Sequence, residues 1–414
     1  MPGEEGEEEM NQSNIRMAWR GLWRHPRRTL LMIGMVAFAS LVIILLWGTI
    51  DGFMASMTDS QISIDQGSLK VRAAGYTEDP APEHGLTPDA LSQAAAALEQ
   101  AGIERYAPRL SAYGMVKSAY GATGVEIRGI DLVRESTVTT LPKLVSQGRG
   151  LEKPGEVLLS ADLAKRLDVR VGERVVLLVQ SEKAPESLAF SAVGFFASGI
   201  PNLDKSAVLV PIDDARRLTG WQGATEIAVA LPRSQNADKV AAKLGGLLGR
   251  GFDVRSFLSL NPLLGQMLKI AKVEMVPMML ILALLAGFGV ANTVLFSVLE
   301  RTREFGVMVA VGMSPKRLAR MVETESLLAS AAGFLVGGAA GYLLLLVMSR
   351  GISIGTQWAS MGGDLAMPTT LYASTSGWYW LASFSVVIVT GLVAAWYPAR
   401  RAAALQPVEA IREN

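Results

Sequence analysis

The chain has 414 residues, half of them apolar, a mean hydropathy of +0.30 and a formal net charge of +1. The presence of two histidines and no cysteine excludes His/Cys metal sites and cysteine nucleophiles. Because the sequence contains no Gly-Lys dipeptide, it has no P-loop for ATP. We therefore expect no catalytic, cofactor or metal site on this chain, and no nucleic-acid partner.

The first 28 residues begin with an acidic run and continue into a segment with two faces. Arginines lie on one helical face, and apolar and aromatic residues lie on the other: Ile15, Trp19, Leu22 and Trp23. This pattern is typical of a helix in the membrane interface, which His25-Pro26 would end. We expect residues 1–28 to form an N-terminal segment with such a helix.

Four long windows lack Asp, Glu, Lys and Arg: 29–50, 275–299, 326–349 and 365–399. Each supplies the roughly 20 apolar residues that a helix needs to cross a bilayer. The first window is too long for a cleaved signal peptide, and no small-residue cleavage pattern follows it. We expect four membrane-spanning helices, at 29–50, 275–299, 326–349 and 378–397.

Basic residues indicate how these helices are oriented. Five arginines precede the first helix, five Lys or Arg lie between the second and third, and three arginines follow the fourth. Positive charge favours the cytoplasmic side. We therefore place both termini (1–28 and 398–414) and residues 300–325 in the cytoplasm, and residues 51–274 and the loop 350–377 outside it.

Residues 51–274 alternate strand-like and helix-like runs, which predicts an α+β domain. Strand-like runs include "SLKVRAA", "GVEIRGI", "ERVVLLVQ", "AFSAVGFF", "SAVLVP" and "TEIAVAL". One helix should begin at Thr87-Pro88 and stop at Gly102. Others should cover 160–167 and 234–248. The fold class is therefore a membrane protein with four transmembrane helices and a large α+β domain between the first two.

The stretch "ERTREFGVMVAVGMSPKRLARMVETE", residues 300–325, holds nine charged residues between two apolar spans. We expect the second helix to continue to about Val311 and stop at Gly312, with Ser314 and Pro315 starting a new helix. Its apolar side, Phe305, Met308 and Val309, would suit a groove on a partner. A helix hairpin packed on the chain's own terminus is the alternative.

This stretch resembles the signature of FtsX-like ABC permeases, which include the MacB-type exporters and the lipoprotein-releasing permeases. "YPARRAAALQPVEAIRE", residues 397–413, resembles the end of the same permease domain. "VEIRGIDLVRE", "DVRVGERVVLLV" and "LDKSAVLVPIDDARRL" look most like the lipoprotein-releasing (LolC/LolE-like) branch. MacB-type proteins carry their ATPase on the same chain, which this sequence does not, and no hook for a periplasmic chaperone is evident.

The resemblance implies a bacterial inner-membrane permease subunit that works by mechanotransmission. Two copies of an ABC ATPase subunit would bind ATP and Mg²⁺, and a second permease chain, identical or related, would complete the assembly. Residues 300–325 would dock on the ATPase, and the residues that the motif singles out for this coupling are Glu300, Arg301, Glu304, Phe305, Gly306, Ala310, Gly312, Met313, Ser314 and Pro315.

A lever needs closely packed helices, and small residues recur at four-residue spacing within the spans. They are Ala283, Gly287 and Ala291 in the second helix and Gly333, Gly337 and Gly341 in the third. Asn292 is the main polar residue of the second helix, and we interpret it as a hydrogen-bonding residue between helices rather than a transport residue.

Three functions remain open from the sequence. The first is release of lipoproteins or other lipid-anchored substrates, with a periplasmic chaperone as partner. The second is MacB-like efflux of peptides or drugs through a periplasmic adaptor. The third is FtsX-like regulation of a cell-wall hydrolase without transport, and a tethered ecto-enzyme is a distant fourth.

Overall fold

The computed structural model describes the chain except residues 1–19, 21, 181–184, 233–234, 354–369 and 405–414. Most of the predicted interfacial helix, most of the loop 350–377 and the end of the C-terminal motif lie outside the described residues. The chain forms two compact units. The described residues of one unit, the helical bundle, lie within 1–54, 269–353 and 370–414, and those of the other, the α+β domain, lie within 55–268.

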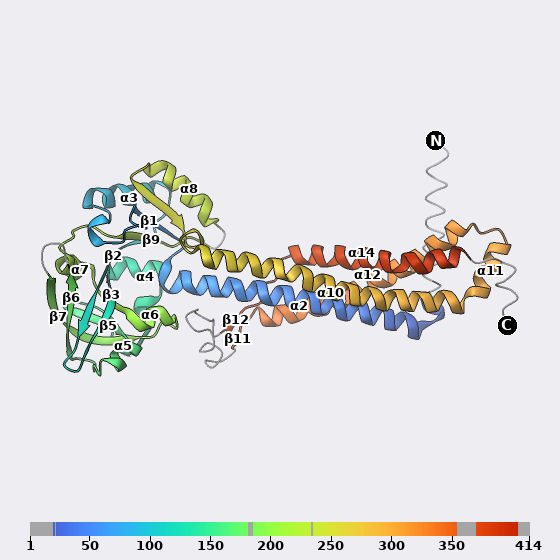
Figure 1. The fold of residues 1–414 in the computed structure, drawn as a ribbon, viewed down its shortest axis with the longest axis horizontal. Coiled ribbons are helices and arrows are strands. Elements are labelled where there is room, and N and C mark those ends of the chain that lie inside the picture. Colours follow the sequence, from blue (N-terminus) through green and yellow to red (C-terminus); the bar gives the residue numbers. More distant parts are fainter. Residues whose placement is uncertain (1–19, 21, 181–184, 233–234, 354–369, 405–414) are drawn as a thin grey trace. The chain divides into compact units, whose positions relative to one another are not determined.

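Four helices of the described chain are long and apolar enough to cross a membrane, as the sequence predicts. They are α2 (Pro26–Gln61), α10 (Pro262–Glu300), α12 (Pro315–Met348) and α14 (Trp378–Ala403), seen in Figure 1. The helices are longer than the predicted spans, because α2 and α10 continue beyond their apolar windows. Residues of both α2 and α10 belong to the bundle and to the α+β domain.

Close backbone contact holds α12 against α2. A Cβ on Gly337 would lie 1.9 Å from the carbonyl oxygen of Ala37, and one on Gly333 would lie 2.7 Å from Cβ of Val36. Neither position can hold a larger side chain unless the two helices separate. The small residues of α12 therefore allow dispersion contacts between helix backbones, which matter in lipid because water supplies no hydrophobic drive there.

Aromatic rings join α12 to α14. Phe334 packs edge-on against Trp380 and Phe384, with ring centroids 5.4 and 5.2 Å apart. Phe334 is buried, and the bundle core continues around it through apolar residues of all four long helices.

The α+β domain is built on one ten-stranded sheet with the order β10-β1-β9-β2-β3-β8-β5-β7-β4, in which β6 pairs with β2 and β7. Most pairs are antiparallel, but β3–β8 and β5–β7 are parallel. The strands are β1 (Leu69–Ala73), β2 (Tyr106–Lys117), β3 (Ala122–Ile130), β4 (Val145–Gly148), β5 (Glu156–Ser160), β6 (Arg174–Gln180), β7 (Pro185–Phe196), β8 (Ala207–Pro211), β9 (Glu226–Val229) and β10 (Phe252–Ser256).

Helices cover this sheet and enclose separate apolar cores. They are α3 (Pro88–Gln100), α4 (Leu132–Val138), α5 (Ala161–Arg166), α6 (Pro201–Ser206), α7 (Ile212–Thr219), α8 (Ala237–Leu248) and α9 (Phe257–Leu260). The predicted start of α3 is confirmed, since the Thr87 hydroxyl accepts a hydrogen bond from the Ala90 N–H and Pro88 is the first helical residue.

Replacing Gly337 by alanine tests the α2–α12 contact. Since the added methyl meets a backbone carbonyl, we expect a loss of about 1–3 kcal/mol of stability. Gly34 is the matched control, because a Cβ there meets no atom within 4 Å. Gly34→Ala should be neutral or stabilise by up to about 1 kcal/mol through helix propensity. Thermal unfolding in detergent measures both, and equal effects would contradict the packing argument.

Candidate functional site

The connection between α10 and α12 contains a short helix set off by two breaks. Helix α10 ends at Glu300, Arg301 has the non-helical angles φ −98 and ψ 14, and α11 spans Thr302–Ala310. The prediction that the second spanning helix continues unbroken to Val311 is therefore wrong, because Arg301 interrupts it. Gly312 follows with φ 105, a left-handed conformation that favours glycine, and turns the chain into α12.

Ser314 and Pro315 lie at the start of α12, where the sequence predicts a new helix. Ser314 is extended at the N-cap and Pro315 is the first helical residue, although the Ser314 side chain makes no capping hydrogen bond. Both are exposed, and Met313 before them is half-buried. The backbone N–H of Met313 donates to the Met308 carbonyl at 3.0 Å, which closes the turn after α11.

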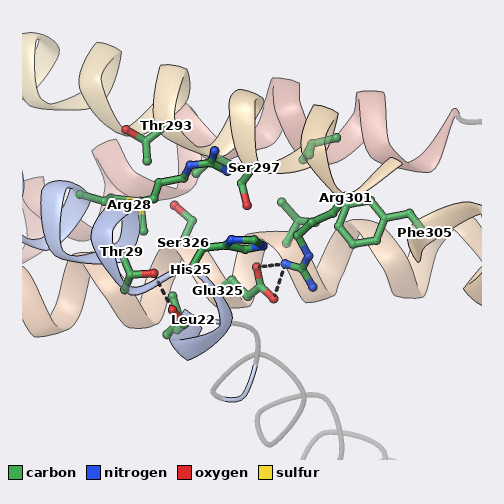
Figure 2. Close-up of a pocket in the computed structure, with 14 residues that line it drawn as sticks. Leu22, His25, Arg28, Thr29, Thr293, Ser297, Arg301, Phe305, Glu325 and Ser326 are labelled. Atoms are coloured by element: carbon green, nitrogen blue, oxygen red, sulfur yellow. Dashed lines mark hydrogen bonds and ion pairs between the residues drawn. The ribbon is translucent and has the colours of Figure 1, made fainter. Parts of the chain in front are cut away.

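A buried ion pair fastens the start of α11 to α12. The side chain of Arg301 is 5% exposed and that of Glu325 is 12% exposed. Arg301 Nη1 donates to both carboxylate oxygens of Glu325, at 3.1 and 3.0 Å (Figure 2). The guanidinium also lies 4.9 Å from the centroid of the Phe305 ring. A charge at this depth is tolerable only with such a partner.

Two further ion pairs link residues at the start of α2 to the segment between α10 and α12. Arg24 Nη1 lies 3.0 Å from Glu304, and both side chains are exposed. Arg28 pairs with Glu300, the last residue of α10. Arg301 Nε in turn donates to Glu304 at 3.3 Å. Arg24, Glu304, Arg301 and Glu325 thus form one chain of alternating charges, and the Arg28–Glu300 pair separately joins α2 to the end of α10.

Arg28, Arg301 and Glu325 line a cavity of about 40 Å³. His25, Arg28, Thr29, Ser297, Arg301 and Glu325 supply its polar lining (Figure 2), and Leu22, Met32, Val298 and Phe305 are among its apolar residues. A water molecule occupies about 30 Å³ in the liquid, so the space suits roughly one water. It cannot hold a substrate, and it could supply a hydrogen bond to Arg28 Nη1, which has no partner among the described residues.

The apolar side predicted to meet a partner is used by the chain itself. Phe305 is 1% exposed, Gly306 is buried, and Met308 and Val309 pack against the bundle core. The expectation that Phe305 and Gly306 offer a docking surface is therefore corrected. The hairpin alternative describes this side of α11 better.

A different face of α11 is open to a partner. Val307 is 49% exposed and Val311 is 84% exposed, with Arg303, Glu304 and Ala310 exposed beside them. The sequence analysis missed both valines, although they recur with helical spacing on the side away from Phe305. We call Arg303, Glu304, Val307, Ala310 and Val311 the outward face of α11.

The predicted packing residues lie inside the bundle to different degrees. Ala283, Gly287, Gly333, Gly337 and Gly341 are buried, whereas Ala291 is half-buried. Gly287 adjoins α14, because a Cβ on it would lie 2.7 Å from the Thr390 methyl carbon.

The α+β domain contains a buried charged cluster of its own. Arg109 donates to the two oxygens of Glu135 at 2.6 and 3.0 Å, and Lys70 Nζ lies 2.8 Å from Glu226. Burial raises the pKa of Glu226, but Lys70, Arg72 and Arg109 outweigh it and hold that pKa well below its usual range. The opposite charges are mutually satisfied, which indicates a structural role. Among the described residues, no group of His, Cys, Asp or Glu side chains could hold a metal ion.

Two family models match the chain: FtsX-like permease C-terminal over residues 277–407 and MacB-like periplasmic core domain over residues 29–247. The chain is 25% identical over 301 residues to the lipoprotein-releasing system transmembrane protein LolC of Xylella fastidiosa, covering 69% of this chain and 72% of that protein. It is 23% identical over 328 residues to LolE of Haemophilus influenzae, covering 75% and 78%.

A third relative matches a smaller share of the chain. The macrolide export ATP-binding/permease protein MacB of Shewanella oneidensis is 38% identical over 125 residues, which is 30% of this chain and 17% of that protein.

Removing one partner of the buried pair should be far more harmful than removing both. Arg301→Ala leaves the Glu325 carboxylate buried alone, and we expect a loss of about 3–5 kcal/mol of stability. Arg301→Leu combined with Glu325→Leu should recover most of it. Arg24→Ala, which breaks an exposed pair, should cost below about 1 kcal/mol. Unfolding in detergent gives all three values, and additive losses in the double variant would refute the pairing.

Proposed function

Because the chain belongs to the FtsX-like ABC transporter permeases with a MacB-like periplasmic core domain, we propose that it couples ATP hydrolysis on a separate ATPase subunit to movement of that domain. The bundle is the membrane part of a multi-pass protein, and we assign it to the bacterial inner membrane with both termini in the cytoplasm. Two ATPase copies and a second permease chain complete the proposed assembly.

The observation that carries the proposal is the outward face of α11. Val307 and Val311 expose apolar surface beside the charged Arg303 and Glu304, at a position flanked by two spanning helices. Exposed apolar side chains rimmed by charges are typical of a protein–protein interface. We assign the ATPase contact to this face, with Glu304 as a polar anchor and Gly312 as the turn behind it.

The buried pair gives this contact a mechanical consequence. Arg301 stands between α10 and α11 and is held on α12 through Glu325, so a push on α11 moves both long helices together. Helix α10 then continues for 39 residues, about 58 Å at 1.5 Å per residue, with Pro277 inside it. Its first residues, up to Leu268, belong to the α+β domain, so the covalent chain itself carries the motion.

The packed bundle favours a lever over a channel. The predicted spans 29–50, 275–299 and 326–349 contain no Asp, Glu, Lys or Arg, and substrate pathways usually place such groups inside the membrane. The 40 Å³ cavity among the described bundle residues is water-sized. Both features support handling of the substrate outside the membrane.

For the substrate we infer lipoproteins or other lipid-anchored molecules. The relatives named for lipoprotein release match 69% and 75% of the chain, including the α+β domain, whereas the MacB relative matches 30%. Efflux through an adaptor is the second candidate, favoured by the higher local identity of 38% to that macrolide exporter.

Val311→Asp tests the docking face. A charge in an apolar contact should weaken co-purification of the ATPase at least about tenfold and lower its permease-stimulated hydrolysis, with folding unchanged. Val133, which is 77% exposed on the α+β domain, is the matched control, and Val133→Asp should leave both readouts intact. Undiminished ATPase binding by Val311→Asp would remove the assignment of this face.

Depletion of the chain in its native host tests the substrate class. If lipoproteins are the cargo, outer-membrane lipoproteins should accumulate in the inner membrane, measured by fractionation and mass spectrometry. Normal lipoprotein sorting together with increased sensitivity to macrolides or peptides would favour efflux instead.

A further inference from the structure

The first spanning helix continues into the α+β domain and ends there in an unusual turn. Helix α2 ends at Gln61 and is followed directly by a π-helical turn, Ile62–Gln66. The Gly67 N–H donates to the Ile62 carbonyl at 2.9 Å, five residues back, which is the π-helical pattern. Such turns are rare and occur frequently at functional sites. Strand β1 begins two residues later, at Leu69, so this turn is the junction between the helix and the sheet.

Asp65 of this turn is buried in an ion pair with the sheet. Its side chain is 3% exposed, and its carboxylate pairs with Arg128 of β3, whose side chain is 9% exposed. The Arg128 guanidinium also donates to Glu126 at 2.9 and 3.3 Å. Opposite charges at this depth stabilise each other, and separating them leaves each one buried without its partner, at a large cost in free energy. The pair therefore resists movement of the turn relative to β3.

Further contacts hold the same turn from other sides. The Ser63 carbonyl accepts hydrogen bonds from the N–H of Thr140 at 2.9 Å and from its hydroxyl at 3.2 Å. Ile64 packs against the apolar core that contains Ile130 and Phe196. Hydrogen bonds, apolar packing and a buried ion pair thus fix three consecutive residues of the turn on the domain.

The connection of α10 to the domain has a different character. Residues 257–268 contain no Asp, Glu, Lys or Arg, so an ion pair with the sheet is impossible there. Asn261 separates α9 from α10 with φ −119 and ψ 71, so these two helices are not continuous. The Asn261 side chain donates to the Phe257 carbonyl at 2.9 Å, within α9 itself.

We propose that the Asp65–Arg128 pair is the joint through which movement of α2 is passed to the sheet of the α+β domain. Asp65 is on a turn continuous with a spanning helix, and Arg128 is on an inner strand. Strand β3 is hydrogen-bonded to β2 and β8, so a displacement of Arg128 reaches its neighbours. The inference rests on the proposed function, because it names a positioning residue for that coupling, and it adds a second connection to that of α10.

Spin labels on the cysteine-free full chain test how firmly this joint holds. Labels at the exposed sites Ala55→Cys on α2 and Tyr113→Cys on β2 report on the joint, and labels at Tyr113→Cys and Leu247→Cys on α8 report on the domain alone. In Asp65→Asn the distribution of Ala55–Tyr113 distances should become at least about twofold wider, because Arg128 loses a buried counter-charge. The Tyr113–Leu247 distribution should stay unchanged.

Asp79→Asn is the matched control, because Asp79 lies in the same domain and pairs with His84 where both side chains are exposed. Both of its distance distributions should equal those of the parent chain. An unchanged Ala55–Tyr113 width in Asp65→Asn would overturn the proposal. Widening of the two distributions together would also overturn it, since the pair would then support the fold of the domain and not the joint.

The consequence for coupling is measured in the assembled transporter, reconstituted in proteoliposomes with a fluorescently tagged lipoprotein. Asp65→Asn should slow ATP-dependent release at least about threefold and leave permease-stimulated ATP hydrolysis within about twofold, with Asp65→Glu recovering part of the release. Equal losses of hydrolysis and release, or release at the parental rate, would contradict the joint. The label measurement needs neither ATPase nor substrate, so it separates failure of this inference from failure of the proposed function.

Discussion

The guanidinium of Arg301 is almost fully buried, and the carboxylates of Glu325 and Glu304 make that position tolerable. Much of the bundle's charged end follows from this pair. The pair lies where the chain bends between α10 and α11, with Phe305 beside the guanidinium and Glu304 shared between Arg301 and Arg24. These contacts join the end of α10, α11 and α12 at one corner of the bundle.

Much of the architecture could be predicted from the sequence because the forces involved are local. The four spans follow from continuous apolar windows, and the start of α3 follows from Thr87-Pro88. The break at Arg301 could not be predicted in this way. The partner of Arg301, Glu325, lies 24 residues away, and helix propensity on either side of Arg301 does not predict the break.

The side of α11 that faces the bundle could not be predicted from the sequence either. Apolar residues occur all around this short helix, so periodicity alone does not say whether Phe305 or Val311 faces inward. Tertiary packing decides, since the Phe305 ring lies beneath Arg301 whereas Val311 follows the last helical turn and finds no cover in its own chain. The motif predicts that this segment contacts the ATPase, but it does not indicate which side of α11 is exposed.

The uninterrupted length of α10 has a simple geometric consequence. A helix axis about 58 Å long that tilts by about 5° displaces its far end by about 5 Å. Movements of a few ångströms are large compared with the tolerance of packed protein surfaces, where shifts below 1 Å already matter. A small tilt at one end of such a helix therefore becomes, at its other end, a displacement that close-packed side chains cannot absorb without rearranging.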